Sequence, residues 1–446
     1  MRTTDTTPHP NGNLSMASQA PVGPTAVSPL GPDFWVFVGY LVFVFLNPQN
    51  WIPVIGAFRP AFLVAGMALV LCLANGRAVG VLRFTQTKLM VLLLGLVSVS
   101  TVLSMSFGLS LEYWGYFLRA FLLYLLFLQV VHDEFKLKKI IQVMFFLMLI
   151  DVAVSFTMQK LWLIGYRLVS FDGEGGSNDY ALMILCMLPF GLYFFEHAET
   201  RTRKGFLAVC ILFLFMALTR TRSRMGFLGL VLIVGQVFWL KRRNPAVILA
   251  VLALVGVALA NTHYGYFERI RGIQESATTE EKENPRIRLW QQAVELIKRH
   301  PFFGTGTGTY IFAKNEYNLS GNKTHVTHNA FLQVASENGL IAGAVYFLLF
   351  LVSFRDLRYA EKAFRGRDPD LLTITQALKM AYPVLVLSMT FLSQQYTQFY
   401  FIFPALTARL RLFAETRIHA EAAAETAEAP AGPGIHPTLA DRAVRS

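Results

Sequence analysis

The chain has 446 residues, of which 54% are hydrophobic and only 15% charged. Soluble proteins carry about 25% charged residues, so the composition excludes an ordinary soluble enzyme, a disordered chain and a collagen-like fibre. The formal net charge of +12 does not imply a nucleic-acid partner, because membrane proteins concentrate Lys and Arg in cytoplasmic loops. A polytopic membrane protein remains.

Residues 1–32 are rich in Pro, Ser, Thr and Gly, which predicts a disordered cytoplasmic tail. Apolar runs of about 18 residues or more, each long enough to cross a bilayer as a helix, then recur within residues 33–418. The pattern predicts an all-α polytopic integral membrane protein with about twelve transmembrane helices. Residues 419–446 are likewise low in complexity and predict a second disordered cytoplasmic tail, in which AEAAAETAEAPAGPG forms either coil or a frayed helix that ends in coil. The expected helix centres are Val42, Met67, Leu96, Leu122, Met148, Leu188, Ile211, Val234, Leu254, Val345, Leu387 and Phe403.

Loop charges predict the orientation. The even-numbered short connections between spans hold seventeen Lys and Arg, and the odd-numbered short connections hold six. If the first span begins in the cytoplasm, the even-numbered connections are the cytoplasmic ones. The positive-inside rule then places both termini in the cytoplasm. A long odd-numbered connection, residues 263–327, falls on the outer side.

The long connection contains an expected amphipathic helix, RIRLWQQAVELIKRH, residues 286–300. Its expected apolar stripe consists of Trp290, Ala293, Val294 and Ile297. The following GTGTGTY predicts a flexible or tightly turning segment.

Basic residues gather at two places on the outer side. TRTRSRMG puts Arg220, Arg222 and Arg224 at the end of a span, where three guanidiniums are costly without an anionic partner. The planar fork of arginine matches phosphate oxygens. Either the three arginines anchor lipid headgroups or they form a pyrophosphate site.

The second basic group is Arg286 with Arg288, at the start of the amphipathic helix. Arg286 shares a helix face with Trp290, four residues later. This group is either a solvated basic face or part of an anion site. Because both groups fall on the same side of the membrane, together they favour the anion site.

A third element is THVTHNAFLQVASENGL, where the long loop re-enters a span. His328 at this boundary is either a structural histidine or a general base that titrates near neutral pH, and His325 is a weaker candidate. Glu337, in the span itself, needs a partner or a water-filled cavity.

Metal and nucleotide chemistry receive little support. The outer loop FDGEGGSNDY carries Asp172, Glu174 and Asp179, which suit either a metal or base site or an exposed turn. The three cysteines lie in apolar runs without CxxC spacing, so we expect neither a disulfide framework nor a zinc site. The sequence contains no Walker motif, no strand followed by GxGxxG and no HExxH.

The order of these motifs resembles the O-antigen ligase and polymerase superfamily of bacterial envelope glycosyltransferases. The motifs are an SRMG arginine element, RxxxW opening an amphipathic helix that continues into HPFFGTGTGTY, and THNAFLQVASENGLIAG opening a span. The resemblance covers roughly residues 34–413 and implies a GT-C-like fold with a large periplasmic loop. One departure is Met225, where the family often has Gly; the extra residues Arg220, Arg222 and Arg288 leave open which arginine contacts phosphate most closely.

The resemblance implies a metal-independent, inverting glycosyltransferase without a cofactor in the bacterial inner membrane. An O-antigen ligase moves a glycan from undecaprenyl diphosphate to lipid A–core oligosaccharide at the periplasmic face. By motif match His328 is the general base, and Arg224 and Arg286 bind the diphosphate and stabilise the leaving group. The long loop should then fold so that Arg286 approaches Arg224 and His328. Further substrate-binding candidates are Arg220, Arg222, Arg288, His325, Trp290 and Glu337.

Three alternative functions stay open. An O-antigen polymerase or a protein O-oligosaccharyltransferase would use the same donor chemistry with another acceptor. A transporter or flippase would also have about twelve spans. Transporters often show paired repeats or broken helices in both halves, and neither is found in this sequence.

Overall fold

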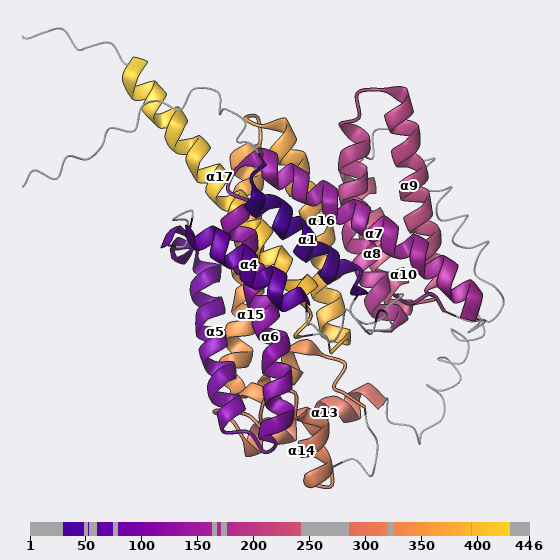
Figure 1. The fold of residues 1–446 in the computed structure, drawn as a ribbon, viewed down its shortest axis with the longest axis vertical. Coiled ribbons are helices and arrows are strands. Elements are labelled where there is room, and N and C mark those ends of the chain that lie inside the picture. The colour runs from indigo at the N-terminus through magenta and orange to yellow at the C-terminus, as the bar shows by residue number, and fades with distance from the viewer. Residues whose placement is uncertain are drawn as a thin grey trace, which may run out of the picture. The chain divides into compact units, whose positions relative to one another are not determined.

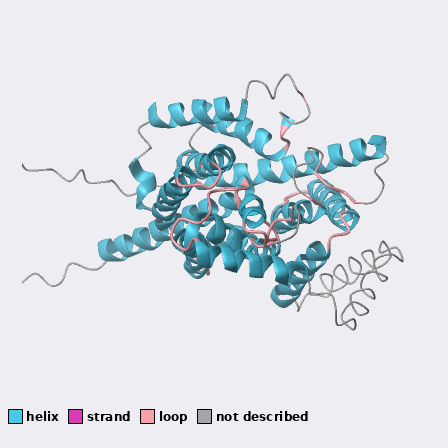
Figure 2. Cartoon of the chain, turned by 90° about the horizontal axis from the view of Figure 1, so that it is seen from below, coloured by secondary structure: helices cyan, strands magenta, loops and turns pink. Residues whose placement is uncertain are grey.

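The computed structural model describes residues 30–48, 52, 60–74, 79–162, 167–170, 176–241, 285–319, 325–393 and 395–428. Within these ranges the chain is helical and contains no strand (Figures 1 and 2). The helices are α1 (Pro32–Phe45), α4 (Pro60–Ala74), the short 3-10 helix η1 (Val79–Arg83), α5 (Thr85–Val102), α6 (Phe107–Val130), α7 (Glu134–Trp162), α8 (Ser177–Glu196), α9 (Arg201–Arg220), α10 (Arg224–Lys241), α13 (Pro285–Arg299), α14 (Tyr310–Glu316), α15 (Ala330–Phe364), α16 (Pro369–Phe391) and α17 (Gln398–Glu428).

Seven of the described helices have the length and apolar composition to cross a membrane: α5, α6, α7, α8, α9, α15 and α16. The apolar helices α1 and α10 are shorter. The all-α polytopic fold is therefore confirmed, whereas the count of twelve spans is not. Eleven of the expected centres fall in separate helices, and the remaining one, Leu254, lies outside the described residues.

The expected domain end at residue 418 falls inside a helix. α17 continues to Glu428, so residues 419–428 of the expected disordered tail are helical. The segment AEAAAETAE is rich in Ala and Glu, two strong helix formers, which explains the continuation. The chain divides after Glu415, with residues 29–415 forming one compact unit.

Within this unit α15 packs against several other helices. It packs against α5 on one side and α16 on another, and α16 in turn packs against α8 and α10 (Figure 1). Polar side chains begin both helices: Asn329 accepts a hydrogen bond from the Leu332 amide at 3.0 Å, and Asp368 accepts one from the Leu371 amide at 2.9 Å. Such N-caps satisfy amides that have no partner within the helix.

α5 and α15 run antiparallel and are joined at both ends. Gln86 Nε2 donates to Asp356 Oδ2 at 2.9 Å, and Ser100 Oγ donates to the Glu337 carbonyl at 2.9 Å. Gln86 and Ser100 are about 21 Å apart along α5, which is most of the roughly 30 Å hydrocarbon core of a bilayer. We call the Glu337 end the site end and the Asp356 end the far end.

α15 bends sharply at Gly339, whose φ of 88° and ψ of 165° are not helical. A Cβ added at Gly343 would lie 2.8 Å from the Ala335 Cβ, although eight residues of straight helix span about 12 Å. Residues 330–338 therefore fold against the start of the longer segment, residues 340–364. This bend positions the short helical segment that follows His328.

Candidate functional site

The first element of the site is the turn between α9 and α10, which carries TRTRSRMG. Side chains alternate along it: Thr221 and Ser223 are buried, whereas Arg220, Arg222 and Arg224 are exposed. The turn therefore presents its arginines outward and uses its hydroxyls for anchoring. Met225, the next residue, is also buried.

Hydrogen bonds hold this turn against α8. Ser223 Oγ accepts the Gly226 amide at 2.9 Å, capping α10, and donates to Asn178 Oδ1 at 2.7 Å. A Cβ added at Gly226 would lie 2.9 Å from the Ala181 Cβ, so α10 sits directly on α8. Arg222 has a positive φ of 49°, a conformation that costs energy and persists only where the surroundings enforce it.

The second element is α13. Its buried residues Ala293 and Leu296 pack with Tyr310 and Ala313 of α14. Val294 is 41% exposed, so the expected stripe is wrong at this position. The amphipathic helix is present. Its buried face includes Ala293 and Leu296 but not Val294, because α14 and α15 pack against that side of the helix.

The start of α13 docks at the end of α16. The Arg286 guanidinium lies 5.4 Å from the centre of the Phe391 ring, and the Trp290 ring lies 6.3 Å from the same ring. Trp290 Nε1 donates to the Thr327 carbonyl at 3.1 Å. These contacts hold Arg286 and Trp290 beside the segment that contains His328.

His328, the third element, lies at the tip of a fixed turn before α15. Its φ is 50°, a left-handed conformation in which His is enriched among non-glycine residues. The buried Thr327 Oγ1 accepts the Asn329 amide at 3.1 Å and lies 2.9 Å from Gln333 Oε1 and 3.0 Å from Ser393 Oγ. The half-buried imidazole therefore has a well-anchored backbone.

The charges of these elements act on one another. Burial and the charge of Arg224 lower the pKa of Arg286, although arginine stays protonated in proteins. Burial, and then the charges of Arg286 and His325, lower the pKa of His328. The structure thus brings Arg224, Arg286, His325 and His328 together from separate segments. An anion bound among them would relieve their mutual repulsion.

The remaining basic candidates are less constrained. Arg220, Arg222 and Arg288 are exposed, and Arg222 receives a hydrogen bond on its carbonyl from the Arg167 guanidinium at 3.3 Å. They lie on the same two elements as Arg224 and Arg286. Their exposure allows contact with a ligand but does not by itself assign one.

The acidic outer loop is only partly described. Asp179 Oδ2 accepts the Gly176 amide at 2.8 Å and so caps the start of α8. Asp172 and Glu174 lie outside the described residues. Among the described residues no group of three or more His, Cys, Asp and Glu side chains is placed to hold a metal ion.

Glu337, one of the substrate-binding candidates from the sequence, has several partners within the described fold. It is fully buried, and its carboxylate accepts hydrogen bonds from the Gly308 amide at 3.0 Å, the Tyr310 amide at 3.3 Å, Gln333 Nε2 at 2.9 Å and the Tyr396 hydroxyl. These bonds supply the partners that a carboxylate within a span needs, and a contact of Glu337 with substrate stays a prediction. Through Gln333 and Thr327, the carboxylate connects to the turn that carries His328.

The GTGTGTY segment is a packed turn held by Glu337. Thr305, Thr307 and Thr309 are fully or almost fully buried, and Thr307 Oγ1 donates to Asn338 Oδ1 at 2.7 Å. A Cβ added at Gly306 would come within 1.9 Å of Ser104 Oγ. Of the two expectations, flexible or tightly turning, the structure shows the second.

We expect Gly339→Ala to destabilise the protein by more than about 3 kcal/mol. The new Cβ would lie 2.0 Å from the Phe302 carbonyl oxygen at a φ of 88°, so both strain and overlap oppose it. Thermal unfolding in detergent measures the effect. Gly95→Ala, on α5, is the control: nothing lies within 4 Å of its added Cβ, and alanine favours helix by about 0.5–1 kcal/mol. Equal melting temperatures for the two variants would contradict the prediction.

Sequence reasoning did not identify Thr327, Phe391, Ser393 and Lys314 as parts of the site. Lys314 is fully buried, and its ammonium donates to the His325 carbonyl at 2.6 Å. A lysine in an apolar helical stretch signals a buried partner, but the sequence does not say which. An aromatic residue at a span end, such as Phe391, is common at membrane interfaces and carries no specific signal.

Comparison with known proteins finds a family match for part of the chain. Residues 198–347 match the family model for O-antigen ligases. The matched region contains Arg224, Arg286 and His328, and it supports the O-antigen ligase and polymerase superfamily. A search of curated proteins finds no match.

Proposed function

We propose, from the O-antigen ligase match over residues 198–347, that the protein is a glycosyltransferase that transfers a glycan from undecaprenyl diphosphate to lipid A–core oligosaccharide. Members of the matched family are glycosyltransferase-like enzymes of ligase or polymerase type. The proposal adds the donor, the acceptor and the roles of individual residues. It places the reaction at the periplasmic face of a bacterial inner membrane, with both termini in the cytoplasm.

The convergence of two arginines and a histidine supports this proposal best. Arg224 and Arg286 act electrostatically on each other, and Arg286 acts on His328, although long stretches of sequence separate them. Two guanidiniums placed together fit the two phosphates of a lipid diphosphate. A half-buried, neutral imidazole next to them fits a general base.

The chemistry follows from this arrangement. An acceptor hydroxyl oxygen attacks the anomeric carbon of the donor glycan, and the bond from that carbon to the diphosphate oxygen breaks. The electron pair stays on the diphosphate, whose growing charge Arg224 and Arg286 stabilise. The hydroxyl proton passes to a ring nitrogen of His328. In-line attack inverts the anomeric configuration, and neither a metal ion nor a cofactor is required for these steps.

The surrounding residues complete the proposed site. Arg220, Arg222, Arg288 and His325 add positive charge for the diphosphate or for anionic groups of the acceptor. Trp290 offers an aromatic surface between Arg286 and His328, since it contacts Phe391 and the Thr327 carbonyl. Apolar helix surfaces would hold the polyprenyl chain.

Glycan transfer by the purified full-length protein tests the proposal. The protein receives undecaprenyl-diphosphate glycan and lipid A–core in the presence of EDTA. New glycosylated lipid A–core supports the ligase. Extension of the carrier-linked glycan alone would identify a polymerase, transfer to a protein would identify an oligosaccharyltransferase, and uptake without transfer would identify a transporter.

The pH dependence should report His328. Because burial and neighbouring positive charges hold its pKa below the ordinary 6.5, the residue stays neutral, and competent as a base, throughout the range above pH 6.5. We expect the acid limb of kcat/KM, which reports the free enzyme, to lie below pH 6.5. His325→Gln should move this limb upward because it removes one of the charges that lower the pKa. A limb above 6.5 that does not respond to His325→Gln would count against His328 as the base.

A further inference from the structure

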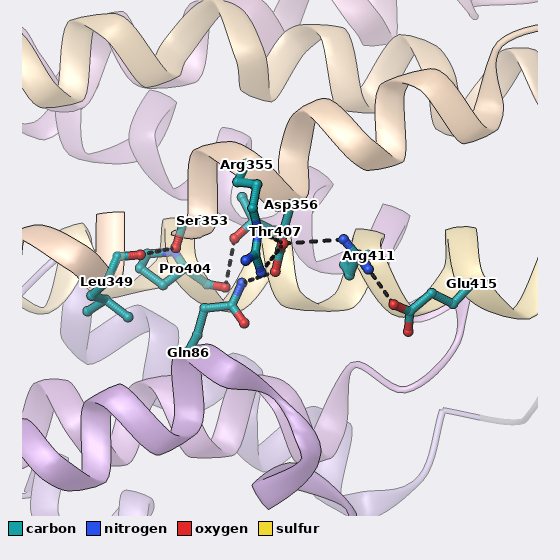
Figure 3. A network of polar contacts seen from close by, with 9 residues as sticks. All are labelled: Gln86, Leu349, Ser353, Arg355, Asp356, Pro404, Thr407, Arg411 and Glu415. Carbon is teal, nitrogen blue, oxygen red and sulfur yellow. Dashed lines mark hydrogen bonds and ion pairs between the residues drawn. The ribbon is translucent and has the colours of Figure 1, made fainter. Parts of the chain in front are cut away.

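The far end of the helical unit contains arginines that have carboxylate partners. Arg355 and Arg411 both contact Asp356 Oδ1, at 2.9 and 3.4 Å, and Arg411 Nε donates to Glu415 Oε1 at 2.6 Å (Figure 3). The same Asp356 accepts the hydrogen bond from Gln86. In this network each positive charge lies beside a negative one.

Two other arginines of this end lack such partners. The guanidiniums of Arg83 and Arg409 lie 5.2 and 5.4 Å from the centre of the same ring, that of Phe84. No described carboxylate lies within ion-pair distance of either. Their like charges repel each other, so the structure holds two cations together without a described counter-ion.

Of these two arginines, Arg409 costs more free energy to keep buried. Its side chain is only 5% exposed, and its buried Nε has no hydrogen-bond partner within the described chain. Buried charges and buried polar groups are normally paired, because leaving one unpaired costs several kcal/mol. A site that keeps such a group is expected to have a ligand that satisfies it.

The described carboxylate that acts on Arg409 is already engaged. Asp133 exerts a favourable field on Arg409, but its Oδ2 lies 3.5 Å from His132 Nε2 and 4.0 Å from Lys136 Nζ, while its Oδ1 accepts the Lys136 amide. Asp133 therefore already serves His132 and Lys136. It cannot neutralise both Arg83 and Arg409.

Position and chemistry together indicate the ligand. Arg83 immediately precedes Phe84 and the first turn of α5, whose 18 residues extend about 27 Å. Because this length nearly matches the roughly 30 Å hydrocarbon core of a bilayer, a guanidinium just before this helix lies at the depth of the headgroups of the opposite leaflet. Guanidiniums match phosphate oxygens in geometry and charge, and basic pockets between transmembrane helices bind anionic lipid headgroups.

We propose that Arg83 and Arg409 bind a phosphate group at the far end, supplied by an anionic phospholipid headgroup or by phosphate free in solution. The site is separate from the proposed diphosphate site and does not rest on the glycosyltransferase function. The Phe84 ring lies against both guanidiniums and positions them. Binding of a phosphate would satisfy the Arg409 Nε and offset the repulsion between the two charges.

Native mass spectrometry of the delipidated, full-length protein in detergent tests this site. Phosphatidylglycerol is titrated against the wild type, Arg83→Gln and Arg409→Gln, with phosphatidylcholine as the zwitterionic comparison. We expect either substitution to weaken phosphatidylglycerol binding by about tenfold, since each removes hydrogen bonds to a charged group. Arg355→Gln is the matched control, because Arg355 is exposed like Arg83 but already has Asp356 as its partner.

A second arm distinguishes the two sources of phosphate. Thermal unfolding is followed with inorganic phosphate in place of lipid. Stabilisation by inorganic phosphate that is lost in Arg83→Gln, together with unchanged lipid binding, supports free phosphate as the ligand. If Arg83→Gln matches the wild type and Arg355→Gln in both arms, the proposal is wrong. The exposed Arg83 keeps this test decisive even if Arg409→Gln fails to fold.

Discussion

His328→Ala should lower the turnover number of glycan transfer by about 10²- to 10⁴-fold while donor binding stays close to that of the wild type. The expected loss is that of a general base, which acts in the transition state rather than in substrate binding. Initial rates with saturating lipid A–core, and a separate measurement of donor binding, give the two quantities.

Two further variants separate the chemistry of His328 from its backbone. His328 has a φ of 50°, so part of any loss in the alanine variant comes from strain in the turn. His328→Asn keeps a residue that tolerates this conformation but has no basic group, and it should be as inactive as the alanine variant. His419→Ala replaces an exposed histidine of α17 and should retain activity. An active asparagine variant would show that His328 shapes the turn and is not the base.

Arg286→Ala and Arg224→Ala should each lower kcat/KM by about 10²- to 10³-fold, the range found when one group that stabilises a developing anion is removed. Both are expected to weaken donor binding as well, because guanidiniums contact the diphosphate before and during the reaction. Arg286→Lys keeps the charge but loses the planar fork, so its activity should be intermediate.

The double variant tests whether the two arginines act on one ligand. If both bind the same diphosphate, the loss in Arg224→Ala/Arg286→Ala should be smaller than the product of the single losses. Arg299→Ala is the matched control, since Arg299 is on the same helix α13 and pairs with Glu295 at 2.9 Å. Retention of transfer within about threefold of the wild type by both single variants, in folded protein, would exclude the diphosphate clamp.

The helices were predictable because each depends on a local run of apolar residues. Eleven of the expected centres fall in separate helices, although the prediction used no information on how those helices pack. The bend at Gly339 was not predictable, since it depends on the close approach of the Phe302 backbone, 37 residues earlier in the sequence. Helix periodicity likewise gave the amphipathic character of α13 but placed Val294 on the wrong side, because the contacting helices choose the buried face.

The candidate site was likewise predictable only in part. Charge and position selected two groups of arginines and the histidine His328 from the sequence, and the resemblance of the motifs to a known family then singled out Arg224 and Arg286. Their proximity depends on contacts between distant segments, such as that of Trp290 with the Thr327 carbonyl. The partners of Glu337 were not predictable, because the four groups that donate to its carboxylate come from the GTGTGTY turn, α15 and the segment before α17.

The position of Trp290 has a consequence for spectroscopy. Its indole packs beside Phe391, which also contacts Arg286. The indole N–H donates a hydrogen bond to the carbonyl of Thr327, the residue before His328. Any ligand that displaces Arg286 or the start of α13 should therefore change the polarity around this indole and shift its fluorescence emission. The protein has six tryptophans, so the difference between wild type and Trp290→Phe isolates the signal and gives the site an optical reporter of its own.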